Sequence, residues 1–321
     1  MHYGFWEQVR RPFFVLAPMA NVTDTVFRQI IMKHGRPDAM WTEFVSCDGL
    51  FSAGRESVLR DLRYSQQERP LVAQIFGAKP ENFYSTAKLI GELGFDGIDI
   101  NMGCPDKGVL KQGAGASLMK NPSLAQEIIR ATQEGTADSG HRLPVSVKTR
   151  LGYLKDELET WIAALLEAQI PVLTVHARTK KELSKVPARW EQMTTVVQMA
   201  KGTGTLIIGN GDVQSLADAE RRVTETGVDG VMLGRAIFGN PWLFNRDGTI
   251  PTLREKLLAL VEHTNLFEQT WGDTKNFELM KKHYKAYVNE FRGAHDLRMT
   301  LMDCENAREI EDKVLDFLAH S

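Results

Sequence analysis

The sequence of 321 residues predicts a (β/α)8 barrel followed by a small helical domain. Short apolar runs recur at intervals of roughly 25–40 residues, which is the spacing of strand-plus-helix units. Polar residues suited to chemistry follow nearly every one of these runs. After Pro241 the strand pattern stops and the remaining pattern is helical. We therefore expect a barrel domain over 1–251 and a helical domain over 252–321.

Eight runs have the length and composition of buried strands. Between them lie helical patterns, with Thr23 and Asp24 as capping candidates for the first helix and Gly94 as a natural stop before the fourth strand. If two of the runs were not strands, an open doubly wound sheet would be the alternative. The first βα turn, APMANVTD, argues against that sheet because it lacks a Gly-rich dinucleotide fingerprint. The predicted strands cover 13–17, 39–43, 71–76, 97–101, 145–148, 172–175, 205–209 and 230–233.

The ends of the predicted strands carry unusual polar groups. In a barrel, chemistry gathers at the carboxyl ends of the strands. One histidine or glutamine at a strand end can be structural, but such groups at eight consecutive strand ends indicate a functional site. The strand-end residues are Ala17, Pro18, Met19, Glu43, Gln74, Asn101, Cys104, Lys148, Arg150, His176, Arg178, Asn210, Gly211, Asp212, Gly234 and Arg235.

The last two strand-to-helix turns, IIGNGDV and VMLGRA, have the composition of an anion site. Barrels often bind phosphate with the loops after strands seven and eight and a helix amino terminus. Backbone N–H groups near Gly211 and Gly234, together with Arg235, would form that site here. Glycine turns also occur simply to reverse the chain, so both interpretations remain at this point.

The stretch from Phe95 to Met119 begins as a strand and breaks at Gly103-Cys104-Pro105. This break places Asn101 and Cys104 on an accessible loop, where binding and catalytic groups are commonly found. A cysteine in such a turn can be incidental, and the other strand ends are what favour a functional role.

Composition restricts the class of protein. Apolar content of 43% and charged content of 25% are ordinary for a globular chain. The three cysteines are too few and too scattered for a disulfide framework or a metal site, and we expect a reducing cytoplasm and no metal. No apolar run is long enough to span a bilayer. The net charge of −2 means that any nucleic-acid site must be a local patch.

Such a patch is predicted in the helical domain. Around residues 277–292 an apolar helix face opposes a cationic face with a single acid, Glu278. A cationic face is usually only solvated, but in a near-neutral chain it is also a plausible polyanion contact. The cationic face carries Lys281, Lys282, Lys285 and Arg292.

Together these motifs resemble the tRNA-dihydrouridine synthases. The matching segments are LAPMANVTD, LVAQIFG, GIDINMGCPDKGVLKQGAGASLM, VSVKTRLG, TVHARTK, IIGNGDV, VMLGRA and the late MKKHYKAYVNEFRGAHDLR. The resemblance covers nearly the whole chain. It implies an FMN-dependent enzyme that reduces the C5=C6 bond of particular uridines in tRNA, with NADPH as the reductant of the flavin.

The resemblance also implies roles for individual residues. Asn101 should bind the uracil edge, and Cys104 should act as general acid, delivering a proton to C5 after hydride addition at C6. We therefore expect Cys104 not to be a highly reactive thiolate. The implied flavin-binding residues are Ala17, Pro18, Met19, Gln74, Lys148, His176, Asn210, Gly211, Asp212, Gly234 and Arg235. The implied RNA contacts are Lys107, Arg150, Arg178, Lys281, Lys282, Lys285, Arg292 and Arg298.

Other interpretations remain for the chain and for single residues. The chain could be an FMN barrel acting on a free pyrimidine, of the dihydroorotate dehydrogenase kind, or a non-catalytic tRNA-binding protein. Glu43 could hold loop backbone or contact substrate, and Arg150 could brace RNA or pair with an acid. We expect Asp99 to be a structural partner at the barrel mouth, Cys47 and Cys304 to be inert, and the protein to be a monomer.

Overall fold

The computed structural model describes residues 1–320. The chain divides into two compact units, one made of residues 1–20 and 38–234 and the other of residues 21–37 and the chain from 235 onward. Residues 235–251 and the segment after the first strand thus group with the helical part of the chain. The functional division between 251 and 252 stays a prediction.

Parallel strands form the centre of the first unit. They are β1 Phe13–Leu16, β2 Met40–Trp41, β3 Val45–Ser46, β4 Leu71–Phe76, β5 Gly97–Asn101, β6 Val145–Arg150, β7 Val172–His176, β8 Leu206–Asn210 and β9 Gly230–Leu233. They pair in the order β2-β1-β9-β8-β7-β6-β5-β4-β3, and β2 also pairs with β4. That pairing closes eight strands into a barrel, which confirms the predicted fold and excludes the open sheet.

The second predicted strand differs from expectation because it is split. Residues 39–43 were expected to form one strand, but β2 ends at Trp41 and β3 begins at Val45. The Thr42 hydroxyl donates to the carbonyl of Glu43 at 2.8 Å and accepts from the backbone N–H of Gln74 at 3.0 Å. A side chain therefore replaces a backbone partner there, and the ladder is interrupted.

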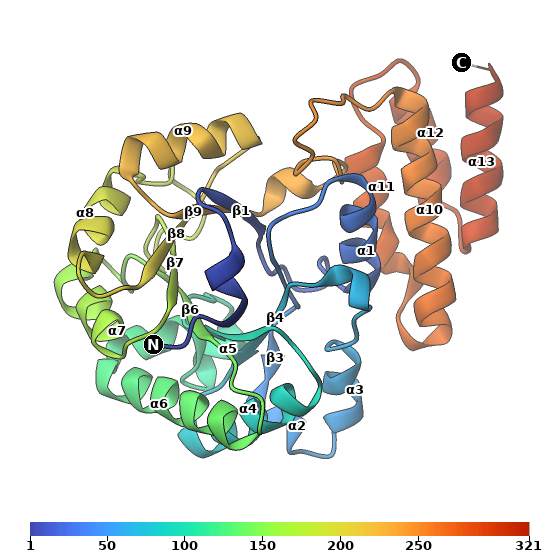
Figure 1. The fold of residues 1–321 in the computed structure, drawn as a ribbon. Coiled ribbons are helices and arrows are strands. Elements are labelled where there is room, and N and C mark those ends of the chain that lie inside the picture. The colour runs from blue at the N-terminus through green and yellow to red at the C-terminus, as the bar shows by residue number, and fades with distance from the viewer. Residues whose placement is uncertain (321) are drawn as a thin grey trace. The chain divides into compact units, whose positions relative to one another are not determined.

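Helices surround the barrel, as Figure 1 shows for α4 and α6–α9. The helical elements of this unit are η1 Gly4–Gln8, α2 Cys47–Leu50, α3 Arg55–Arg60, η2 Gln66–Glu68, α4 Pro80–Glu92, α5 Lys107–Lys111, η3 Gly115–Lys120, α6 Pro122–Asp138, η4 Leu158–Ile162, α7 Ala163–Glu167, α8 Glu191–Ala200 and α9 Leu216–Thr226. Gly94 follows α4 with a left-handed φ of 79°, as the helix-stop prediction requires.

The barrel interior is apolar at the amino ends of the strands. Trp6 of η1 lies 5.2 Å from Phe13 and 6.1 Å from Trp41, measured between ring centroids. These rings belong to one buried cluster with Val72, Val172 and neighbouring side chains. The amino end is therefore filled by packing, which leaves the carboxyl end for polar chemistry.

The second unit is helical. Its elements are α1 Thr25–His34, η5 Arg235–Ile237, α10 Leu253–Trp271, η6 Gly272–Thr274, η7 Phe277–Met280, α11 Lys281–Tyr287, α12 Ala294–Met302 and α13 Ala307–His320. Asp24 caps α1 by accepting from the N–H of Phe27, as predicted, and also accepts from the indole of Trp271 at 2.7 Å. Leu257, Leu260, Tyr284 and Ile310 are among the side chains of its buried core.

The predicted continuous helix around residues 277–292 is wrong in its extent. The segment is a 3-10 turn followed by α11, which ends at Tyr287, and Glu290 has a φ of 60°. Met280, Tyr284, Tyr287 and Val288 are buried as the apolar pattern predicts. Within the described residues no helix is long and apolar enough to cross a membrane.

Candidate active site

A cavity of about 160 Å³ opens at the carboxyl ends of the barrel strands. It brings together six residues predicted from the sequence, and it adds Phe44, Gly103 and Pro105. Typical ligand sites have a volume of about 300–1,000 Å³. This cavity is therefore only part of a ligand site, namely the part next to the reacting groups. The lining residues are Pro18, Phe44, Gln74, Asn101, Gly103, Cys104, Pro105, Lys148 and Arg150.

Asn101 shapes the cysteine loop. It is the last residue of β5, and its Oδ1 accepts from the backbone N–H groups of Gly103 at 3.1 Å and Cys104 at 2.9 Å. The amide oxygen thus takes the two donors that the ladder can no longer satisfy. The loop that carries the thiol is held by a side chain of the strand it leaves.

Asp99 lies two residues before Asn101 on the same strand and is fully buried. Its Oδ1 accepts from the hydroxyl of Ser146 at 2.6 Å and its Oδ2 from Nε2 of Gln74 at 2.7 Å. The Oε1 of Gln74 accepts from Nδ2 of Asn101 at 3.1 Å. A directional chain therefore runs from the Asp99 carboxylate through two amides to the Cys104 N–H. We call it the Asp99 relay.

The relay fixes amide orientations that would otherwise be ambiguous. A carboxylate only accepts, so Gln74 must present its nitrogen to Asp99 and its oxygen to Asn101. Burial raises the pKa of Asp99 to about 6, against the opposing effects of Gln74, Ser146 and the Lys148 charge. The carboxylate is consequently mostly ionised at neutral pH.

Lys148 is a cation with few protein partners. Its Nζ donates to Oδ1 of Asn210 at 3.3 Å, and Asn210 donates in turn to the carbonyl of Met232 at 2.8 Å. An ammonium group has three donors, so two remain for a ligand in the cavity. Burial, together with the nearby Arg150 charge, lowers the pKa of Lys148 to about 8.

Cys104 lies half-buried at the rim of the same cavity. Burial raises the pKa of its thiol above the ordinary value, with smaller contributions of either sign from nearby groups. The thiol form therefore dominates at neutral pH, which suits a proton donor and does not suit a nucleophilic thiolate.

Arg150 clamps the cysteine loop from β6. Its Nε donates to the carbonyl of Gly103 at 2.8 Å, and its NH1 donates to the carbonyls of Thr179 and Leu183 at 3.4 and 3.2 Å. These acceptors are backbone, so the alternative of an acid partner is not what the structure shows. Burial lowers the pKa of Arg150 to about 10, so it remains charged at neutral pH.

The end of β7 carries His176 and Arg178. Arg178 is 2% exposed, and its NH1 lies 3.1 Å from Nε2 of His176. Its Nε donates to the carbonyl of Val186 at 2.6 Å, and its NH2 pairs with the carboxylate of Asp212. Because a guanidinium only donates, His176 must accept at Nε2, which places the proton of a neutral ring on Nδ1. The predicted RNA contact of Arg178 is not tested by these contacts.

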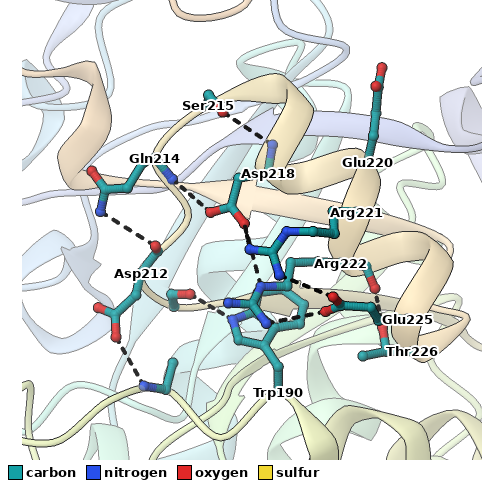
Figure 2. A network of polar contacts seen from close by, with 12 residues as sticks. Trp190, Asp212, Gln214, Ser215, Asp218, Glu220, Arg221, Arg222, Glu225 and Thr226 are labelled. Carbon is teal, nitrogen blue, oxygen red and sulfur yellow. Dashed lines mark hydrogen bonds and ion pairs between the residues drawn. The ribbon is translucent and has the colours of Figure 1, made fainter.

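The turn from β8 to α9 is held from beneath by Trp190, as Figure 2 shows. The indole N–H donates to the carbonyl of Gly211 at 2.8 Å, and the guanidinium of Arg222 lies 5.2 Å from the ring centroid. Gly211 has a φ of 130°, and a Cβ there would lie 2.8 Å from the Cβ of Ala188. Only glycine fits this turn, which leaves its backbone open to a ligand.

The carboxylate of Asp212 cannot itself bind an anion. It accepts from Arg178 and from the backbone N–H of Ala188 at 2.9 Å. Asp212 has a left-handed φ of 56°. Its predicted contribution to a phosphate site therefore depends on its backbone N–H, because a second anion would be repelled by the side chain.

The remaining predicted residues lie in several places. Ala17, Pro18 and Met19 follow β1, and the position of a Cβ on Gly234 would be 3.5 Å from Ala17 and 3.8 Å from the Met19 sulfur. Lys107 is exposed on α5. Arg235 belongs to the second unit and is exposed. In that unit Lys281 pairs with Glu278 at 2.5 Å, Arg298 donates to the carbonyl of Val288 at 3.0 Å, Lys282 is half-exposed, and Lys285 and Arg292 are exposed.

Two contributors, Ser146 and Trp190, were missed from the sequence. Asp99 was expected as a structural partner at the barrel mouth, and it is hydrogen-bonded to Gln74 of the cavity lining and to Ser146. Its spacing of two from Asn101 was the available signal, because alternate residues of a strand share a face. Ser146 and Trp190 had no comparable signal. Glu43 is buried.

The residues present fit a flavin. Lys148 lines the cavity and has two unused donors, and Gln74 and Asn101 each keep one amide N–H after donating to Asp99 and to Gln74, respectively. A flavin ring presents carbonyl and nitrogen acceptors along one edge, which this donor set matches. Among residues 1–320 no group of three or more His, Cys, Asp and Glu side chains could hold a metal ion.

Fold and pocket together define a TIM barrel with a polar site at the carboxyl ends of its strands. The structure is similar to morphinone reductase, with a TM-score of 0.54 and 13% identity over 74% of this chain and 86% of that chain. It is also similar to DHODH from Eimeria tenella in complex with ferulenol, with a TM-score of 0.51 and 15% identity over 80% of this chain and 81% of that chain. At these identities the likeness establishes the barrel fold.

The sequence comparisons identify the family. The dihydrouridine synthase (Dus) profile matches residues 15–320. A probable tRNA-dihydrouridine synthase of Staphylococcus aureus (strain MRSA252) is 40% identical over 99% of this chain and 97% of its own length. A probable tRNA-dihydrouridine synthase 2 of Bacillus subtilis (strain 168) is 38% identical over the same shares. The chain belongs to the dihydrouridine synthase family, a family of flavin-dependent oxidoreductases, and the resemblance seen in its motifs is confirmed.

Proposed function

We propose that the protein reduces the C5=C6 bond of specific uridines in tRNA, with FMN as its resident cofactor. The observation that carries the proposal is the shared cavity, in which a protonated thiol, Cys104, faces the same space as an under-partnered cation, Lys148. Hydride acceptance by a uracil ring creates enolate-like charge, and the cavity holds both a proton donor and a positive charge to meet it.

The flavin supplies the hydride for C6 when it is bound. Gln74 and Lys148 would hold its ring through the donors that they have to spare, with His176 at the end of the next strand. The backbone N–H groups of the turns at Asn210, Gly211, Asp212 and Gly234, with Arg235, would form its phosphate site. Ala17, Pro18 and Met19 would contact the ring.

Cys104 delivers the proton to C5. The S–H bond breaks as the C5–H bond forms, the thiolate keeps the electron pair, and a proton from water restores the thiol. Burial keeps the thiol protonated before transfer by raising its pKa. Asn101 binds the uracil edge with its remaining N–H, and its oxygen keeps the thiol loop in place.

RNA reaches this cavity only if the target base leaves its stack, which costs a few kcal/mol. Phosphate contacts offset that cost, and the proposed contacts lie in both units. Arg178 contributes indirectly, since all three of its guanidinium nitrogens have partners within the chain. The other proposed contacts are Lys107, Arg150, Lys281, Lys282, Lys285, Arg292 and Arg298.

The remaining parts of the proposal concern context. NADPH reduces the flavin, the enzyme works in the cytoplasm as a monomer, residues 1–251 carry the chemistry, and residues 252–321 bind tRNA. Support comes from the family membership and from the cationic residues of the helical segment. Anaerobic reduction with NADPH and with NADH, followed by flavin absorbance, tests the reductant.

The deciding experiment is anaerobic single turnover. Reduced protein is mixed with tRNA that lacks dihydrouridine, or with free uridine nucleotide, and flavin absorbance is followed. We expect reoxidation by tRNA alone, and a loss of about 100-fold or more in Cys104→Ala, the range of a general acid. Cys304→Ala is the matched control because Cys304 is a buried cysteine of the helical unit.

Each other outcome has a definite meaning. Rapid reoxidation by free nucleotide would support an enzyme of free pyrimidines instead. Equal rates in Cys104→Ala and wild-type protein would refute the proton-donor assignment. Protein that takes up no FMN but binds tRNA would leave the non-catalytic binding protein as the surviving interpretation.

A further inference from the structure

Two loops at the carboxyl end of the barrel form one rigid platform. The loop after β6 and the loop after β7 are joined by backbone hydrogen bonds from Lys180 to the carbonyl of Gly152 and from Lys181 to that of Tyr153, each 2.9 Å. Gly152 permits the tight turn, because a Cβ there would lie 2.1 Å from the carbonyl oxygen of Lys155. Side chains on this platform are therefore presented by a defined backbone.

The acids of the platform are all used to fold it. Asp156 pairs with both terminal nitrogens of Arg189 at 2.7 and 2.6 Å. Glu157 accepts from the N–H of Tyr153 at 2.7 Å, and Glu182 accepts from the N–H of Thr179 at 2.7 Å and from Arg189 at 3.0 Å. None of these carboxylates forms an ion pair with a lysine of the platform.

Two lysines lie over the Tyr153 ring and three more lie on the platform loops, and none of the five has a carboxylate partner among the described residues. Lys120, from the end of the cysteine-loop segment, lies 4.0 Å from the centroid of the Tyr153 ring, and Lys180 lies 4.7 Å from it. All but the half-exposed Lys180 are exposed. We call this set the lysine rim: Lys120, Lys155, Lys180, Lys181 and Lys185.

Comparison with a second tyrosine shows that the charge around Tyr153 is unusually positive. Tyr84 on α4 also has a lysine over its ring, Lys88 at 5.8 Å, but its hydroxyl donates to Asp138 at 2.8 Å. That hydrogen bond raises the pKa of Tyr84. At Tyr153 burial acts to raise the pKa, but hydrogen bonds and charge from Lys120 and Lys180 hold it below its ordinary value. The same side chain thus reports a net positive environment at the rim.

We propose that the lysine rim is a docking surface for the phosphate backbone of the RNA substrate, on the barrel itself. The inference rests on the proposed function and adds to it a contact surface that is separate from the predicted helical cations. Lys120 and Lys180 share one aromatic ring and repel each other, and a polyanion laid across them and the neighbouring lysines reduces that repulsion. Four of the five lysines lie on loops that leave the same strand ends as Lys148, Arg150 and His176, and Lys120 ends η3.

The test is the salt dependence of tRNA binding. Each phosphate contact contributes roughly 0.7–0.9 to the slope of log K against log salt. Lys120→Gln combined with Lys180→Gln should lower the slope by about 1.5 and weaken binding about tenfold at physiological salt. The single-turnover rate at saturating tRNA should stay at the wild-type value, because the rim does not line the reaction cavity.

A matched control removes the same charge elsewhere. Lys88→Gln combined with Lys201→Gln leaves the rim intact and should leave the slope unchanged. Phenol titration against a Tyr153→Phe reference should show a raised Tyr153 pKa in the rim variant, which confirms that the local charge was removed. An unchanged slope in the rim variant, or an equal fall in the control, would overturn the inference. Failure of wild-type protein to reoxidise with tRNA would instead count against the proposed function.

Discussion

Asp99→Asn separates the charge of the Asp99 relay from its hydrogen bonds. Asparagine has the shape of aspartate and can point its oxygen to Nε2 of Gln74 and its nitrogen to the hydroxyl of Ser146. The serine then redirects its own hydrogen to the carbonyl of Ile98, which already lies 3.3 Å away. The relay geometry survives and a single negative charge disappears.

The expected effect falls on Lys148. The Asp99 carboxylate raises the Lys148 pKa, which burial and Arg150 lower to about 8. An opposite charge close to a titratable group is worth about one unit or more. Without it the Lys148 pKa should fall to about 7, and the protonated fraction at pH 7.5 should drop from about three quarters to about one quarter.

Two assays read this shift. Single-turnover flavin reoxidation by tRNA should have its alkaline limb moved about one unit toward acid, with roughly a threefold loss at pH 7.5. The midpoint potential of the bound flavin, measured against pH without RNA, should change slope at the same lower pH. Superimposable pH profiles for Asp99→Asn and wild type would refute the charge coupling.

A companion variant tests the orienting role. Asp99→Leu removes the acceptor, so the buried Nε2 of Gln74 loses its partner at a cost of about 1–3 kcal/mol. The Asn101 amide is then free to turn, and we expect faster hydrogen exchange at the Gly103 and Cys104 amides. Ser146→Ala, which keeps the carboxylate and the Gln74 contact, serves as the control.

Two further predictions concern Lys148 and the helical unit. Lys148→Met should lower the midpoint potential of the bound flavin, because the cation beside the reduced ring is lost; titration with a reference dye measures it. His263 is buried against Phe27, and burial lowers its pKa to about 3. Its contribution to stability is therefore fully present above pH 6.5 and is lost as the pH falls from 6.5 towards 3. From pH 7.5 to 5 it should cost about 2 kcal/mol in urea unfolding. His263→Phe, which keeps the ring stack, should remove that part of the pH dependence, and equal losses in both proteins would contradict the assignment.

The strands were predictable because their signal is local. In a parallel barrel both faces of a strand are buried, so each strand appears as a continuous apolar run whatever its neighbours are. The exception is the split between β2 and β3, where Thr42 bonds to Gln74, a residue 32 positions away in the chain. No pattern within 39–43 carries that information, because it depends on the neighbouring strand.

The helix around residue 288 shows a different reason for a wrong prediction. Its apolar periodicity is correct for burial, since Tyr284, Tyr287 and Val288 are all buried. The backbone nevertheless leaves the helix at Tyr287, and Glu290 takes a left-handed φ of 60°. Periodicity reports which side chains face the core, and it does not report whether one helix or two short elements bring them there.

The sequence predicts which residues belong to the candidate site better than it predicts what each of them does. The strand-end rule finds Lys148, Arg150 and Arg178 without distinguishing them, since the sequence offers three cations on adjacent strands. Counting acceptors separates them. Arg178 and Arg150 each use three of five guanidinium donors within the chain, and Lys148 gives one of three donors to Asn210.

The share of donors with partners within the chain indicates the role of each cation. A buried cation that is hydrogen-bonded through two or three of its nitrogens is fixed in place and shapes its surroundings, as Arg178 does for His176 and Arg150 for the Cys104 loop. Lys148 has donors to spare, so its own chain offsets less of its desolvation cost, and burial lowers its pKa to about 8. Such a group gains most when an electron-rich ring fills the cavity. We therefore expect Lys148 both to contribute to cofactor binding and to stabilise negative charge during the reaction. The two arginines hold the Cys104 thiol and the His176 imidazole in position.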